Sequence, residues 1–142
     1  MSLPAEEKEH FVHGHSSLVR LLDEVEAHID GLQGCQTPDF MIEELKPYWN
    51  AFKQELFEHI DEEENEMFPH LTGKNDRNLR ALQKQHGDLK SRVDEITQFI
   101  QTYTHNEEHF KKFQWLIDDF RAAFKRHSAD EREFILRSVG AP

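Results

Sequence analysis

The stretch His59-Ile60-Asp61-Glu62-Glu63 is matched later in the chain by His127-Ser128-Ala129-Asp130-Glu131. Both stretches place a glutamate four residues after a histidine, and on a helix such residues lie on one face, a turn apart. A lone histidine precedes each stretch, His15 by 44 residues and His86 by 41 residues. The chain therefore repeats one pattern. We expect four helices around a common site, two with one histidine each and two with HxxxE each.

Apolar residues recur at helical spacing in four segments, as in helices that bury one face in a bundle. The inward positions are Phe11, His15, Leu18, Leu22, Val25 and Ile29; Leu45, Trp49, Phe52, Leu56, His59, Glu63 and Met67; Leu79, Leu82, His86, Leu89, Val93, Ile96 and Ile100; and Phe113, Leu116, Phe120, Phe124, His127, Glu131 and Phe134. Short connections make sequential helices antiparallel neighbours. We predict an all-α fold, an antiparallel up-down-up-down four-helix bundle that forms a single domain over residues 1–142.

Glycine, proline and threonine residues indicate where the first helix ends and the second begins. We expect the first helix to start within residues 4–13 and to end at Gly31 and Gly34. Thr37 is the expected N-cap of the second helix, because a threonine side chain can accept a hydrogen bond from a free backbone N–H group. Pro38 then occupies the first helical position, where its missing N–H group costs nothing.

Three further signals set the remaining boundaries. Pro47 is unfavourable inside a helix, so we expect either a kink there or a helix that starts just before it. Pro69 and Gly73 are expected to end the second helix. Thr104-His105-Asn106-Glu107 fits a capping box, in which a threonine and a glutamate three residues later satisfy each other's backbone N–H groups. We therefore expect the fourth helix to start at Thr104.

Composition excludes several classes of function. The net charge of −11, with no block of Lys or Arg residues, argues against nucleic-acid binding, which needs a positive surface. The one cysteine, Cys35, cannot form an intramolecular disulfide, and we interpret it as an incidental surface thiol in a reducing cytosol. No stretch approaches the roughly 20 apolar residues of a membrane span, and no signal peptide is evident. We expect a cytoplasmic protein that uses neither nucleic acid nor membrane.

The residues of the repeated pattern can meet at one level of the bundle. His15 and His86 lie near the starts of their helices, whereas His59 and His127 lie toward the ends of theirs. In an antiparallel bundle, with a rise of roughly 1.5 Å per residue, these positions fall within about a turn of one another. Burial of the two glutamates is unfavourable without a partner. We predict two metal ions, with a six-residue ligand set: His15, His59, Glu63, His86, His127 and Glu131.

Simpler interpretations exist for each residue alone. A single histidine on an inward face is usually a core side chain with a backbone partner. The remaining histidines fall off the inward positions and are interpreted as surface residues, although two of them could lie over the mouth of the site: these six are His10, His13, His28, His70, His105 and His109. Solvated surface charge is the expectation for Glu62, Glu64 and Glu66. For the aromatic residues Tyr48, Trp49 and Tyr103, packing is favoured over a redox or gating role.

The type of ligand narrows the choice of metal. Imidazole and carboxylate groups suit iron, manganese or zinc, and the lack of thiolates disfavours a structural zinc site. Six ligands leave coordination positions open on two ions, where O₂, NO or peroxide could bind. The carboxylates, and an oxide or hydroxide from solvent, are suited to bridge the ions. The ferritin-like di-iron design, with Glu-x-x-His on two helices, fits poorly because here the histidine comes first.

The ordered set of six residues resembles the haemerythrin-like family, also called the HHE cation-binding domain. The resemblance extends from about Phe11 to Val139, and the run Glu63-Glu64-Asn65-Glu66-Met67-Phe68-Pro69 is similar to that family's helix-end signature. It implies a non-haem di-iron centre, with the six residues as ligands and both glutamates bridging the irons. It also implies an oxo- or hydroxo-bridged iron pair as the cofactor.

The sequence departs from the oxygen-carrying haemerythrins at two places. Those proteins have a second histidine where this chain has Lys90, and they carry HxxxxD where this chain has HxxxE at His127. One iron would therefore have fewer nitrogen ligands, which argues against simple reversible carriage of O₂. The set is more similar to the branch that contains bacterial iron-cluster repair proteins and the iron-sensing domain of an F-box ubiquitin ligase subunit.

Three functions follow as hypotheses. The first is a binding or sensing module, in which the di-iron centre takes up O₂ or NO or reports iron or redox state. The second is a di-iron enzyme, such as an oxidase, a peroxide- or NO-detoxifying enzyme, or an iron-sulfur cluster repair protein. The third is a metal-free structural bundle. No side chain outside the six ligands is placed for acid–base catalysis, so the first hypothesis is preferred. No protein partner is indicated.

Overall fold

A computed structural model describes the backbone of residues 5–71 and 76–140 and the side chains of residues 15–70 and 77–137. The described chain is helical between short connections. In chain order the elements are α1 (Ala5–Asp30), α2 (Pro38–Glu62), the π-helix η1 (Glu63–Met67), α3 (Phe68–Leu71), α4 (Asp76–Gln101) and α5 (Glu107–Gly140). The helices α1, α2, α4 and α5 are long, and η1 and α3 continue directly from α2.

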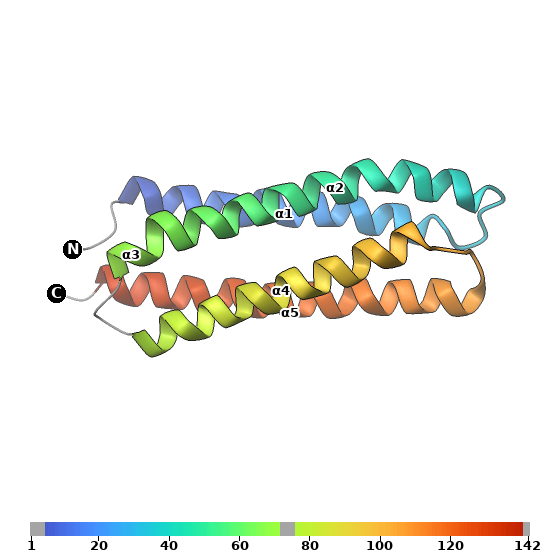
Figure 1. Ribbon diagram of the computed structural model, residues 1–142. Coiled ribbons are helices and arrows are strands. Elements are labelled where there is room, and N and C mark those ends of the chain that lie inside the picture. The colour runs from blue at the N-terminus through green and yellow to red at the C-terminus, as the bar shows by residue number, and fades with distance from the viewer. Residues whose placement is uncertain (1–4, 72–75, 141–142) are drawn as a thin grey trace.

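The four long helices form an antiparallel bundle, as predicted. Helix α1 contacts α2 and α5, and α4 contacts the same two helices, so each long helix has two neighbours. The start of α1, the end of α5 and α3 lie at one end of the bundle, and the α1–α2 and α4–α5 connections lie at the other (Figure 1). On the surface, Arg121 of α5 pairs with Asp23 and Glu26 of α1 at 2.7 Å.

The predicted inward residues are buried wherever the structure describes their side chains, except that His15 remains partly exposed. Phe11 lies outside the described side chains. The buried apolar residues form two clusters of unequal size. The larger cluster, which we call the aromatic core, fills the bundle from Leu18 and Phe124 to the α1–α2 connection. The smaller one, the end cluster, consists of Met67, Phe68, Leu79, Leu82, Phe134 and Ile135.

The aromatic core is held by ring contacts and one polar anchor. Trp49 stacks on Phe52 with ring centroids 5.5 Å apart, and Phe52 meets Phe120 edge to face at 5.5 Å. The Trp49 indole N–H donates to Thr97 Oγ1 at 2.9 Å, so the buried indole leaves no donor unpaired. The preference for a packing role of Trp49 is thereby confirmed.

The turn between α1 and α2 begins where the glycines predicted it. Helix α1 ends at Asp30, and Gly34 has φ of +70°, a left-handed conformation in which a Cβ atom would be strained. Thr37 is the N-cap of α2 with Pro38 following it, but its side chain makes no capping hydrogen bond. The alternative start just before Pro47 is wrong, because α2 begins at Pro38 and continues through that proline.

The second helix was expected to end at Pro69 and Gly73, and the described helical residues continue past Pro69 to Leu71. After Glu62 the chain makes one π-helical turn, in which the Phe68 N–H donates to the Glu63 carbonyl, and the helix then continues to Leu71. A proline has no N–H group and its ring clashes with the carbonyl four residues earlier. The wider turn that precedes Pro69 changes this local geometry and allows both Met67 and Phe68 to be buried. Gly73 lies outside the described residues.

The predicted N-cap of the fourth helix, Thr104, is two residues too early. Helix α5 begins at Glu107, and the His109 N–H donates to Asn106 Oδ1 at 2.8 Å. The His109 ring contributes a second contact, with Nδ1 2.7 Å from the Thr104 carbonyl oxygen. Asparagine is among the strongest N-caps, and here it takes the capping role that was assigned to Thr104.

None of the helices within residues 5–71 and 76–140 combines the length and apolar character needed to cross a membrane.

The cap of α5 gives a direct test of the fold. An Asn106→Ala substitution removes the acceptor for the His109 N–H group and should lower the free energy of unfolding by about 1 kcal/mol. Urea denaturation followed by circular dichroism measures the change. Thr104→Ala is the matched control, because its side chain is exposed and should cost much less. Equal losses in both variants would contradict this assignment of the cap.

Candidate metal centre

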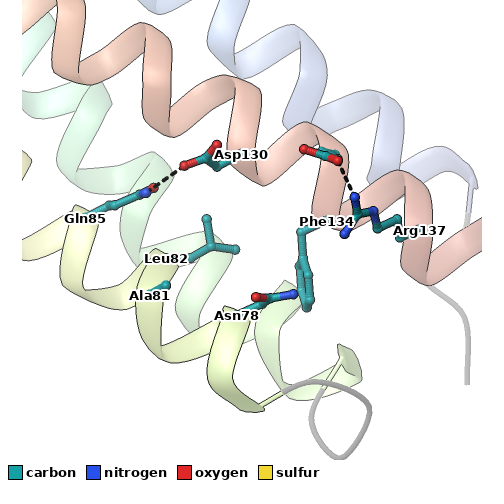
Figure 2. A pocket seen from close by; sticks show the side chains of 8 residues that line it. Asn78, Ala81, Leu82, Gln85, Asp130, Phe134 and Arg137 are labelled. Atoms are coloured by element: carbon teal, nitrogen blue, oxygen red, sulfur yellow. Dashed lines mark hydrogen bonds and ion pairs between the residues drawn. The ribbon is translucent and has the colours of Figure 1, made fainter.

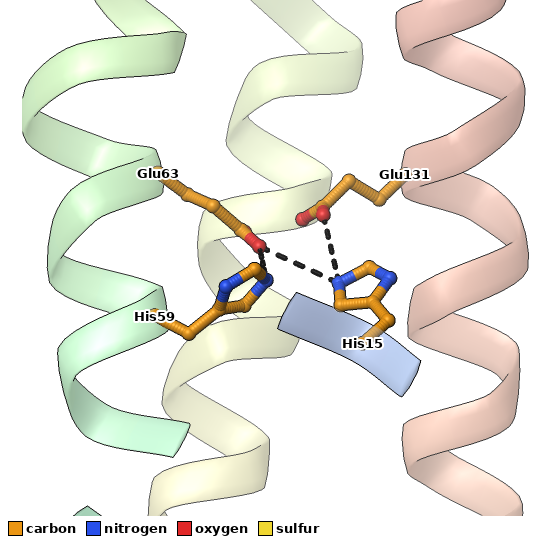
Figure 3. Close-up of side chains that lie close together, drawn as sticks. All are labelled: His15, His59, Glu63 and Glu131. Carbon is orange, nitrogen blue, oxygen red and sulfur yellow. Dashed lines mark ion pairs between the residues drawn. The ribbon is translucent and has the colours of Figure 1, made fainter. Parts of the chain in front are cut away.

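The six predicted ligand residues lie together inside the bundle. They come from all four long helices and from η1, which supplies Glu63. The layer that they form lies between the aromatic core and the end cluster: Leu18, Leu56 and Phe124 are about one turn away on one side, and Met67 and Phe134 on the other. Figure 3 shows four of the six side chains converging, with Glu63 and Glu131 on opposite sides.

Each carboxylate divides its two oxygens between two pairs of histidines. Oε1 of Glu63 lies 3.5 Å from His15 Nε2 and also contacts His59 Nε2. Oε1 of Glu131 lies 3.1 Å from the same His15 atom. The Oε2 atoms face the other way: that of Glu63 lies 2.9 Å from His86 Nε2, and that of Glu131 lies 3.1 Å from His127 Nε2.

This division produces two four-residue groups that share both glutamates. One group is His15, His59, Glu63 and Glu131, and the other is Glu63, His86, His127 and Glu131. Within each group the potential ligand atoms lie within 4.8 Å of one another. Each group therefore offers two histidine nitrogens and two carboxylate oxygens to one candidate metal position. Each glutamate gives one oxygen to the first position and its other oxygen to the second.

The buried polar atoms of this cluster fit metal ions better than they fit one another. Glu63 and Glu131 have no exposed surface. Within the described residues, Oε1 of Glu63, both side-chain oxygens of Glu131 and Nε2 of His15 have close neighbours but no hydrogen bond of acceptable geometry. Native proteins rarely leave several buried polar atoms in this state. Cations between the imidazoles and carboxylates would satisfy all of them.

Charges within the cluster shift the pKa values of His15, His86 and Glu131 strongly. Burial alone would lower the pKa of His15 and of His86, but the neighbouring carboxylates of Glu131 and Glu63 outweigh it and raise these pKa values to about 9 and about 10. For Glu131, burial opposes ionisation, yet its contacts with Glu63 and the histidines hold its pKa well below the usual value. Without metal, the cluster thus balances negative carboxylates with imidazolium groups at neutral pH.

His86 has a carboxylate at each ring nitrogen. Its Nδ1 lies 2.9 Å from Glu64 Oε1, while its Nε2 faces Glu63 at 2.9 Å. The ring also lies parallel to Phe68, with centroids 5.5 Å apart. The expectation that Glu64 is only a solvated charge is wrong: its side chain is 34% exposed and its carboxylate is a partner of a candidate ligand. The helical pattern alone places Glu64 beside the inward face, which is why it was overlooked.

His127 is held through a two-residue chain that the sequence did not indicate. Its Nδ1 lies 2.8 Å from Gln85 Oε1, and Gln85 Nε2 donates to Asp130 Oδ2 at 2.9 Å. Figure 2 shows Gln85 and Asp130 facing each other across α4 and α5. They line a pocket of about 170 Å³ that also includes Asn78 and Arg137. Gln85 precedes His86 and Asp130 precedes Glu131 in the sequence, but that adjacency alone does not predict a contact between α4 and α5.

The other histidines with described side chains do not join the cluster. His28 Nδ1 donates to the Glu24 carbonyl oxygen at 2.8 Å and the ring lies against Tyr48. His105 contacts the Tyr103 hydroxyl. His70 is exposed. The side chains of His10 and His13 lie outside the described residues. Their position over the mouth of the site therefore stays a prediction from the sequence.

A pocket reaches the cluster from one side. It has a volume of about 460 Å³, lies between α1 and α5, and is lined by His15, Ser16, Ser128, Glu131 and Leu136 among others. The His15 side chain is 17% exposed, whereas His86 and His127 are almost fully buried. Solvent or a small molecule can therefore approach the His15 side of the cluster, and the His86 side is closed by packing.

The raised histidine pKa values predict how the metal-free protein responds to pH. Both values exceed the unfolded value of 6.5, so the stabilisation is complete below about pH 6.5 and is lost as pH rises through about 9 to 10. The temperature at the midpoint of thermal unfolding of the metal-free protein should therefore decrease as the pH is raised from 8 to 10.5.

A His15→Gln variant is the control for this measurement. It lacks one of the two titrating groups and should lose less stability over the same pH interval. If the wild-type chain and the variant lose stability equally, the carboxylates do not hold the proton on His15.

Comparison with known proteins agrees with this geometry. A search of curated proteins and of solved structures found no match. A family model described as "Hemerythrin HHE cation binding domain" matches residues 8–137, a segment that contains both four-residue groups. Because the match covers most of the chain, the protein belongs to the haemerythrin HHE cation-binding family.

Proposed function

We propose that this protein binds two iron ions in the shared layer and takes up a small ligand, O₂ or NO, as a binding or sensing module. The ligands in this proposal are the six residues of the two groups, with Glu63 and Glu131 common to both. Family membership supports a cation-binding role. The choice of iron and of a diatomic ligand goes beyond that membership and is the proposal.

The observation that carries the proposal is the opposite orientation of the two oxygens of each carboxylate. A carboxylate that served only as a counter-ion would need no histidines at both oxygens. Here the Oε1 atoms of Glu63 and Glu131 face His15, and the Oε2 atoms face His86. This is the arrangement expected of two bridging carboxylates between two cations.

The donor set is compatible with iron. Each group offers two imidazole nitrogens and two carboxylate oxygens, a mixture that suits iron, manganese and zinc. No cysteine lies in either group, and Cys35 follows α1 in the turn at the far end of the bundle. Six side chains leave coordination positions on two ions unfilled, and a bound iron pair would supply those positions together with a change of oxidation state.

The protein around the proposed iron pair is asymmetric. On the His15 side, the pocket of about 460 Å³ gives a small molecule a path to the cluster. On the other side, Phe68 covers the His86 ring and excludes solvent. The apolar layers on both sides of the cluster keep bulk water away from it. These features allow a ligand such as O₂ or NO to reach the site without exposing the whole layer.

An enzyme is the second candidate, and one observation favours it. The pocket beside His15 and Glu131 is larger than a diatomic molecule needs, so peroxide or a small organic substrate could also enter. Turnover of peroxide or NO distinguishes an enzyme from a binding module.

Metal loading should change both stoichiometry and stability. Anaerobic addition of Fe(II) to the metal-free chain should give two tightly bound ions, measured by elemental analysis after gel filtration. Because the unfolded chain has no preformed site, free metal at 100 times its dissociation constant should stabilise the fold by about 2.7 kcal/mol. Differential scanning calorimetry with and without iron measures the shift.

Variants locate the ions. Glu63→Ala removes a shared carboxylate and should abolish binding of at least one ion, whereas His105→Ala, outside both groups, should leave two ions bound. The proposal would be contradicted if the wild-type chain bound no iron, or if its thermal unfolding were identical with and without iron.

Gas binding can be followed in one optical experiment. Loaded protein should change its absorption spectrum on exposure to O₂ or NO, because a ligand that binds iron alters charge-transfer bands. A single stoichiometric change that reverses under nitrogen supports a binding module. Repeated consumption of NO or peroxide supports the enzyme instead, and no response to O₂, NO or peroxide would exclude both.

A further inference from the structure

The outer ring nitrogens, Nδ1, of His86 and of His127 are each held by a side chain that is not a candidate ligand. In His86 this atom contacts the Glu64 carboxylate at 2.9 Å, and in His127 it contacts the Gln85 side-chain oxygen at 2.8 Å. His86 and His127 belong to the same four-residue group, so both of these supported nitrogens lie at one metal position.

These contacts determine which nitrogen keeps its proton when a cation binds. An ionised carboxylate only accepts hydrogen bonds, so in the metal-free chain both ring nitrogens of His86 donate, Nδ1 to Glu64 and Nε2 to Glu63. A cation placed between the imidazoles and the shared carboxylates would displace the Nε2 proton, while Glu64 keeps the proton on Nδ1. Nδ1 of His127 also donates a hydrogen bond, and here the acceptor is itself held by a second residue. Asp130 accepts from the Gln85 amide N–H group, which turns the amide oxygen toward His127 and makes Nδ1 the donor. In both rings Nε2 is thereby prepared to bind a cation.

The support from Glu64 differs in kind from that of Gln85. A carboxylate that accepts from Nδ1–H increases the basicity of the opposite nitrogen and orients the ring, and loss of such a partner usually costs 10- to 100-fold in metal affinity. A neutral amide orients the ring with less electronic effect. The stack of Phe68 on His86, with parallel rings, further restricts rotation. His86 is thus the most firmly oriented of the candidate ligands for which these contacts are described.

We propose, building on the proposed di-iron function, that Glu64 is a positioning residue for His86 and that it makes the His86–His127 position the more strongly retaining of the two metal positions. Gln85, fixed by Asp130, supports the same position through His127. The His15–His59 position, beside the pocket and with a partly exposed ligand, releases its ion first. The two metal ions are therefore held with different lifetimes.

Release of Fe(II) to a coloured chelator tests this proposal. Wild-type protein loaded anaerobically with two Fe(II) ions should release them in two phases of equal amplitude. In Glu64→Gln the slow phase should accelerate about 10- to 100-fold, with the fast phase unchanged. A His15→Asn variant should lose the fast phase and keep the slow one, which assigns each phase to its position.

Two further variants complete the design. Glu66→Gln makes the same change of charge two residues away at an exposed position and should alter neither phase. Gln85→Leu should accelerate the slow phase, by less than Glu64→Gln, and provides a second reading if Glu64→Gln does not fold.

The outcomes separate this inference from the function on which it depends. A wild-type chain that releases two ions in one phase overturns the inference. Equal acceleration of both phases in Glu64→Gln also overturns it, because the residue would then act only on general stability. A slow phase that is unchanged in both Glu64→Gln and Gln85→Leu does the same. A wild-type chain that binds no iron overturns the proposed function itself.

Discussion

Two negative charges buried in an apolar interior are the constraint on which the rest of this structure depends. Glu63 and Glu131 have no exposed surface, and an ionised carboxylate removed from water is strongly unfavourable unless positive charge compensates it. The bundle places the two side by side, where they would also repel each other. Four imidazoles arranged around them are the only neighbours in the described layer that can share protons or cations with them. The positions of His15, His59, His86 and His127 follow from this requirement.

Much of the fold could be predicted because the apolar residues recur at the spacing of one helix face. Stripes such as Leu18, Leu22 and Val25 specify a buried face without reference to the partner helix. Spacing likewise predicts that the histidine and glutamate of each HxxxE meet. That both pairs lie at one level follows once the bundle is antiparallel, because His59 and His127 occupy late positions in their helices. These steps use only rise per residue and direction.

The exact helix boundaries could not be predicted, because neighbouring residues offer alternative caps and turns of similar energy. Thr104 and Asn106 are both good N-caps, and the ring of His109, which lies against the Thr104 carbonyl oxygen, is part of the local arrangement that places the cap at Asn106. Likewise, the π-helical turn at Glu63 is a change in hydrogen-bond pattern that leaves the same residues available to an α-helix. The role of Glu64 arises between helices, since its partner is on α4, and a helical pattern read along one segment cannot show such a contact.

The unequal division of the apolar interior has a consequence for the protein without its metal. The aromatic core contains most of the buried rings, whereas the end cluster has six residues and adjoins the charged layer. Six side chains bury too little surface to keep water from the carboxylates once the cations leave. Hydration would therefore enter from the end that carries α3, while the half around Trp49 stays folded. Loss of metal would therefore loosen the two poles of the bundle unequally, with the shorter apolar pole opening before the longer one.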